Sequence, residues 1–206
     1  YCGEECMNAH WPKHKEFHRK QKQVAEERVR EGVQLDRMRS LAEAVARRAE
    51  RTGGEYDKRF AAALAFGVED DHNATAKAWR KIIQEWPDRP APYQNLAGVL
   101  QRSNHKPEAA QMFLKAMELY EDGTERWALS AAAAFDLLKT DDCDDLPKPE
   151  WWNEEALKAL SARVVALAPD KTRPCLMRAF VLCGDALGKA PWNVGPRTAA
   201  EIKEAA

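Results

Sequence analysis

The sequence predicts an all-α protein built as an α-solenoid, in which pairs of helices stack on one another. Apolar residues recur every three to four positions through most of the 206 residues, which is the period of helices with one buried face. No stretch shows the strict alternation of apolar and polar residues that is typical of a half-buried strand. Similar apolar positions also recur about 34 residues apart, which indicates a repeated supersecondary unit.

Residues 1–18 contain candidate metal ligands. Cys2 and Cys6 are four positions apart, so they project from one face of a helix, and His14 and His18 form a second such pair. Thiolate sulfur and imidazole nitrogen are the donors that zinc binds in tetrahedral protein sites. The spacing predicts chelating pairs and leaves open whether they share one ion. His10, between the pairs, is a further possible donor.

The string Tyr-Cys-x3-Cys-x4-Trp-x2-His-Lys-x2-His resembles the second half of a MYND-type zinc finger. The matching positions are Tyr1, Cys2, Cys6, Trp11, His14 and Lys15. Where the family usually has a final Cys, this sequence has His18, and imidazole is also a zinc donor. The resemblance implies two zinc ions, with Cys2 and Cys6 at one. It places His14 and His18 at the other, and both ions need ligands upstream of Tyr1, so the sequence looks like a piece of a longer chain.

Two further residues of this segment, His10 and Trp11, have expected roles. His10 matches a variable position of the family and is expected at the surface rather than on the metal. Trp11 is expected to pack beside the metal, where its ring could also contact a partner.

Residues 19–55 are predicted to form a linking amphipathic helix. Val, Leu, Met and Ala recur at helical spacing among Glu and Arg between Gln21 and Arg51. The pattern fits one long helix or two helices joined near Gly32. Gly53 and Gly54 are predicted to end it, because glycine tolerates the left-handed conformation of helix termini.

Residues 56–206 are predicted to form helical repeats, with helix pairs at about 56–86, 90–120 and 125–168. The apolar pattern of residues 93–119 resembles a tetratricopeptide repeat. Its positions are Tyr93, Leu96, Ala97, Leu100, Ala109, Ala110, Phe113, Ala116 and Leu119. Small residues let paired helices approach closely, and large residues fill the groove to the neighbouring pair. Trp79 matches Phe113 one repeat earlier, and Trp127 begins the pattern again one repeat later.

A fourth, divergent pair is expected at Cys175–Leu187 and Arg197–Ala205. Cys175 and Cys183 are predicted to be buried, because they lie among apolar residues. The acidic run Asp141–Asp145 interrupts the third pair, and a solvated loop is favoured over a calcium site because the run lacks the spaced oxygens of a calcium loop.

Composition restricts the partners and the compartment. Lys and Arg number 32 against 33 Asp and Glu, a net charge of -1, which does not favour nucleic acid as the partner. No run of about 18 apolar residues is present, so no membrane-spanning helix is expected. Five unevenly spaced cysteines form no disulfide framework, which favours a reducing, intracellular compartment, either nucleus or cytoplasm.

The sequence predicts a binding protein and not an enzyme. Asn104 and His105 are similar to the Asn-His motif of SET-type methyltransferases, but they fall in a turn between helices, and the β-rich body of that domain is missing. The expected function is a zinc-binding adaptor for other proteins. The alternative is a fragment of a MYND-containing enzyme, such as a SET-type lysine methyltransferase, whose catalytic part lies outside this sequence.

Four residues are candidates for partner binding. Trp11 is the candidate in the finger, and the other three are polar positions of the 90–102 helix that packing does not require: Gln94, Gln101 and Arg102. Their amide and guanidinium groups could hold a peptide backbone or a carboxylate. The alternative is that these three are ordinary exposed helix residues.

Overall fold

The computed structural model describes residues 19–20, 22–23, 33, 36–37, 39–51, 53–68, 71–183, 200 and 203–204. This part of the chain is helical and contains no strand, so the predicted all-α class is confirmed for it. The chain divides into two compact units, Tyr1–Asp70 and Asp71–Ala206. The division falls inside the predicted pair 56–86, so the two helices of that pair belong to different units.

The first unit contains a helical segment that precedes Gly53, and α2 (Glu55–Val68). Residues 39–51 are helical, and the Gly53 N–H donates a 2.9 Å hydrogen bond to the Ala49 carbonyl. Gly53 has a φ of 66°, the left-handed conformation expected at this terminus. The predicted end of the helix is therefore confirmed, whereas the question of a break near Gly32 lies outside the described residues.

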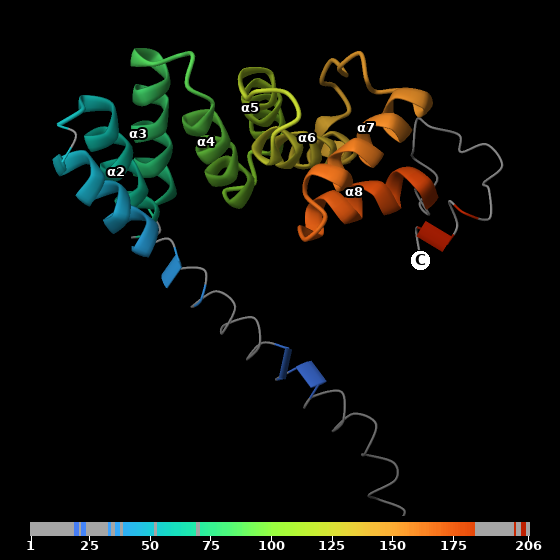
Figure 1. Cartoon of the computed structure of the whole chain (residues 1–206), viewed down its shortest axis with the longest axis horizontal. Helices are drawn as coiled ribbons and strands as arrows, with labels where there is room; N and C mark the ends of the chain where they lie inside the picture. Colours follow the sequence, from blue (N-terminus) through green and yellow to red (C-terminus); the bar gives the residue numbers. More distant parts are fainter. Residues whose placement is uncertain are drawn as a thin grey trace, which may run out of the picture. The chain divides into compact units, whose positions relative to one another are not determined.

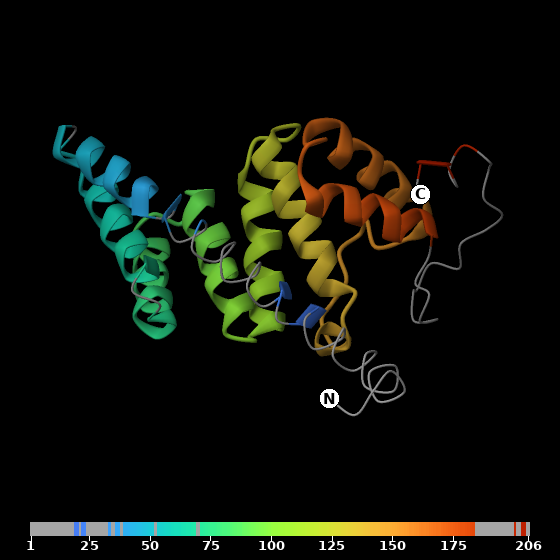
Figure 2. The same ribbon diagram turned by 90° about the horizontal axis from the view of Figure 1, so that it is seen from below.

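The second unit is a succession of helices, seen in chain order in Figure 1 and from below in Figure 2. They are α3 (His72–Glu85), α4 (Pro90–Arg102), α5 (Lys106–Leu119), α6 (Glu125–Leu138), α7 (Glu154–Leu167) and α8 (Thr172–Cys183). Each helix packs on the next, and α6 also packs on α8. The predicted units at 90–120 and 125–168 agree with the bounds of α4–α5 and α6–α7.

Local sequence signals explain where these helices begin. The Asp71 carboxylate accepts a 2.9 Å hydrogen bond from the Ala74 N–H at the start of α3. Asn153 caps α7 in the same way, by accepting a 3.0 Å bond from the Ala156 N–H. Both side chains satisfy a backbone donor that the first turn of a helix leaves free. A proline in the first turn of α4 and of α5 costs no hydrogen bond there.

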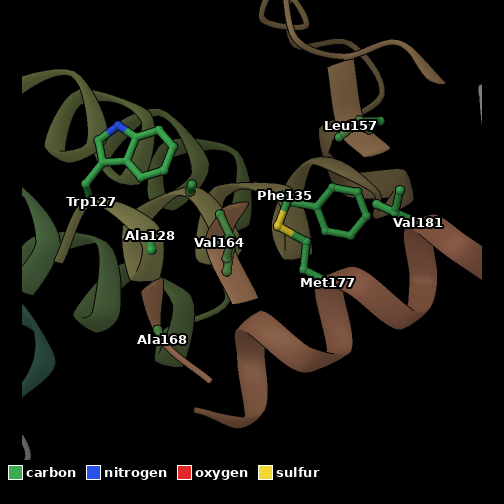
Figure 3. Packing of buried hydrophobic residues seen from close by; sticks show 10 residues of the cluster. Trp127, Ala128, Phe135, Leu157, Val164, Ala168, Met177 and Val181 are labelled. Carbon is green, nitrogen blue, oxygen red and sulfur yellow. The ribbon is translucent and has the colours of Figure 1, made fainter. Parts of the chain in front are cut away.

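The core lies where the repeated pattern placed it. Of the apolar positions named above for residues 93–119, all but the half-buried Leu119 are buried, and so are Trp79 and Trp127. Helix α6 is covered on nearly every side, and its run of alanines lets α5, α7 and α8 approach it. Side chains of α6, α7 and α8 meet in one cluster, which includes Phe135, Leu157 and Met177 (Figure 3).

The prediction that Cys175 and Cys183 are buried is wrong, because both are exposed. The buried positions of α8 are Pro174, Met177, Val181 and Leu182, so the helix is rotated to turn both cysteines outward. Cys143 is the buried cysteine of the described chain, and burial raises the pKa of its thiol.

The connection from α6 to α7 is long and ordered by one lysine. Lys148 Nζ donates 2.9 and 2.7 Å hydrogen bonds to the carbonyls of Leu138 and Cys143, and it lies 5.4 Å from the centre of the Trp152 ring. A cation at the end of α6 offsets the partial negative charge of the last carbonyls. Asp142 forms a 2.7 Å ion pair with Lys106 of α5, which holds the acidic loop to the neighbouring pair.

Candidate functional site

The sequence-predicted metal ligands Cys2, Cys6, His14 and His18 lie outside the described residues, and so does Trp11. Within the part of the chain that the structure describes, no three His, Cys, Asp or Glu side chains are grouped as a metal site would require. In the same part, no helix is long and apolar enough to span a membrane.

The three predicted partner-binding residues of α4 have different surroundings. Gln94 is half-buried, and its side-chain oxygen accepts a 2.7 Å hydrogen bond from the Tyr120 hydroxyl at the end of α5. Gln101 is also half-buried, whereas Arg102 is exposed. Gln94 therefore ties α4 to α5, a structural role that the sequence did not indicate.

Gln101 belongs to a group of polar side chains from three helices. Arg173 Nη2 of α8 lies 3.4 Å from the Gln101 side-chain oxygen of α4 and can donate to it. Arg173 Nε lies 4.0 Å from a carboxylate oxygen of Asp136 on α6, and Lys139 Nζ lies 3.4 Å from the other oxygen. We call these four residues the Gln101–Lys139 network.

The network is partly exposed and carries a net positive charge. Two cations share the single carboxylate of Asp136, so one positive charge is left without compensation inside the network. Lys139 Nζ also lies 3.6 Å from the centre of the Phe180 ring of α8. This arrangement places a cation directly beside an aromatic face that is itself partly open to solvent.

Recognition is the chemistry that these groups offer. A guanidinium and an ammonium bind carboxylates by charge-assisted hydrogen bonds, and the adjoining ring offers apolar contact. Sequence reasoning identified Gln101 and missed Asp136, Lys139 and Arg173. The available signal was weak, since these residues are isolated charges in helices that are otherwise mostly apolar or small.

No protein-family model, no curated protein and no solved structure matches the chain.

Proposed function

We propose that the protein is an adaptor that binds other proteins, with a zinc-binding MYND-type finger at residues 1–18 and tetratricopeptide-like helix pairs beyond it. The Gln101–Lys139 network carries the proposal, because it brings polar side chains from three sequentially distant helices to one partly exposed place. In the proposed repeat arrangement α4, α6 and α8 are the first helices of successive pairs. Stacked repeats use such shared surfaces to bind extended or helical segments of other proteins.

The zinc part of the proposal is supported by the donor set. Two thiols and two imidazoles in residues 1–18 are the ligand types that zinc prefers. Cys2, Cys6, His14 and His18 would hold the metal together with ligands from outside this sequence. Zinc at such sites supplies folding energy rather than chemistry, so the finger would be a rigid recognition module.

Zinc analysis of the full-length protein tests the first module. Cys6→Ser and His14→Ala should each lower the zinc content measured by elemental analysis, because each removes a donor. His10→Ala is the matched control, since that imidazole is not an expected ligand, and it should leave the zinc content unchanged. Unchanged zinc in the Cys6 and His14 variants would contradict the assignment.

Partner capture tests the second module. A partner is first identified by crosslinking and affinity capture with the full-length protein in its native cell, and its binding is then measured with purified components. The double variant Gln101→Ala/Arg102→Ala should weaken that binding while the helical signal stays intact. A Glu118→Ala variant, changed at an exposed position of α5, should bind as the unaltered protein does. If the double variant binds the partner as well as the Glu118→Ala variant does, α4 is not part of the binding surface.

A further inference from the structure

Helix α8 is apolar on almost every side. Between Pro174 and Cys183, Arg178 is the single charged residue. One side of the helix packs against the core, yet Leu176 and Phe180 on another side are 50% and 36% exposed. A helix that is apolar all round is normally buried, so its outward side is a candidate contact surface.

Four residues on the outward side of α8 are aligned. They are Leu176 and the residues three, four and seven positions after it, Ala179, Phe180 and Cys183. This spacing places them along one side of the helix. Ala179 is half-buried and Cys183 is exposed. We call these four residues the α8 patch. A partner helix that docks on such a stripe does so with anchors at matching spacing.

Positive charge lies at one edge of the α8 patch. Lys139 Nζ is 3.6 Å from the Phe180 ring centre, and Arg173 lies one turn before Leu176 on the same helix. Asp136 is the carboxylate shared by these two cations, so this edge retains a net charge of about +1. Carboxylates of a bound segment would complete the charge balance.

We propose that the α8 patch, together with Lys139 and Arg173, is the docking surface for an apolar segment of another protein that is flanked by Asp or Glu. Its apolar side chains would cover Leu176 and Phe180, and its carboxylates would face the two cations. The inference rests on the proposed adaptor function and specifies the chemistry of the partner.

Two other occupants of the α8 patch are favoured less. A second copy of the chain would bring two more cations and only one more carboxylate to this surface, so it would add positive charge and not offset it. The chain's own Glu204 bonds to Arg178, which is two positions from both Leu176 and Phe180. A separation of two positions turns Arg178 to nearly the opposite side of α8, so the contact with Glu204 does not involve the α8 patch.

Peptide binding to the full chain tests the proposal. One fluorescent helical peptide presents Leu and Phe anchors flanked by Glu, and a second has Lys in place of each Glu. Fluorescence anisotropy should show at least tenfold tighter binding of the acidic peptide. Its affinity should fall as salt is raised, because charges attract it. Equal or tighter binding of the basic peptide would overturn the proposal, as would failure of the folded protein to bind either one.

Matched variants identify the surface used. Phe180→Ser and Leu176→Ser should each weaken binding of the acidic peptide about tenfold or more. Phe66→Ser is the control, because Phe66 is 39% exposed on α2 in the other unit, and it should have no effect. Lys139→Ala should weaken binding and flatten the salt dependence, whereas Lys115→Ala on α5 should change neither.

The two proposals fail in different ways. If the acidic peptide binds but the Phe180 and Leu176 variants bind equally well, the α8 patch is wrong and the adaptor function stands. If light scattering shows a dimer that Phe180→Ser dissociates, a second copy occupies the patch and the proposal is overturned. If the unaltered full-length protein captures no partner in its native cell, the adaptor function itself is rejected.

Discussion

Arg178 and Glu204 are joined by two hydrogen bonds, 2.8 Å from Nε and 3.0 Å from Nη2 to the two carboxylate oxygens. The remaining guanidinium nitrogen, Nη1, donates to the Lys158 carbonyl and to the Ser161 hydroxyl of α7. The Arg178 side chain is only 14% exposed. One nearly buried cation thus connects α7, α8 and a residue 26 positions further along the chain.

Glu204→Gln should lower the free energy of unfolding by about 1–2 kcal/mol. The change removes the negative charge that compensates Arg178, and charged hydrogen bonds contribute about 1.5–3 kcal/mol each, less where one partner is exposed as Glu204 is. Urea denaturation followed by circular dichroism measures the difference.

Glu118→Gln is the control for this measurement. Glu118 pairs with Lys115 on one exposed helix face, and such pairs contribute about 0–1 kcal/mol. If both substitutions lower the free energy of unfolding equally, the bidentate contact of Arg178 with Glu204 adds no more stability than an exposed ion pair.

Phe113→Ala should destabilise the second unit by about 3–5 kcal/mol, because Phe113 of α5 is 4% exposed and its truncation leaves a cavity. Phe66→Ala, at an exposed position, should cost no more than about 0.5 kcal/mol. Thermal and urea unfolding measure both. A near-silent Phe113→Ala would contradict the packing of α5 against its neighbours.

Tyr120→Phe should cost about 0.5–1.5 kcal/mol, because it removes the hydroxyl that donates to Gln94. Gln94→Ala should cost a similar amount, and the double variant should cost less than the sum of the two, since both remove one interaction. Arg102→Ala should stay within about 0.5 kcal/mol. Additive effects at Gln94 and Tyr120 would mean that their contact contributes no stability.

A chelator should leave the helical signal of residues 71–183 intact. Their core consists of apolar contacts such as those around Phe135 and Leu157, so it should form without a bound metal ion. Circular dichroism of the full chain before and after chelation measures the signal, and added zinc is the control for reversibility. Loss of most of the signal would contradict the modular organisation.

Helix bounds and core positions could be predicted because their causes are local. Gly53 ends a helix by its own conformational freedom, and the apolar period of α4 and α5 marks the buried side, including Phe113. The rotation of α8 could not be predicted in this way. An apolar helix has no polar face to mark its outward side, so the exposure of Cys175 and Cys183 follows only from packing on α6 and α7.

The candidate site was predictable only in part for a related reason. Gln101 and Arg102 stand out as polar positions on the amphipathic α4. Arg173 lies 72 positions from Gln101, and their contact depends on how three helices pack. Cys143 is buried in a loop that is likewise held by a nonlocal contact, since Lys148 bonds to the carbonyls of both Leu138 and Cys143.

Lys106 and Asp142 should give the protein a pH-dependent contact between α5 and the acidic loop. The hydrogen bond from Lys106 lowers the pKa of the Asp142 carboxyl, and the same bond raises the pKa of Lys106. Because its pKa is lowered, Asp142 contributes fully to the free energy of unfolding above its ordinary pKa. That contribution is lost as pH falls through the pKa that Asp142 has in the folded protein. Lys106 contributes fully to the free energy of unfolding below its ordinary pKa, and that contribution is lost as pH rises through its raised pKa.

Lys106→Met tests this coupling. An NMR titration should show the pKa of Asp142 rising toward its ordinary value in the variant, because the hydrogen-bonded cation is gone. The stability difference between the two proteins should be largest near neutral pH and should vanish once acid protonates Asp142 in both. High salt should shrink the difference as well, since both groups are partly exposed. A difference that persists unchanged into acid would assign the effect of the substitution to lost side-chain packing and not to the ion pair.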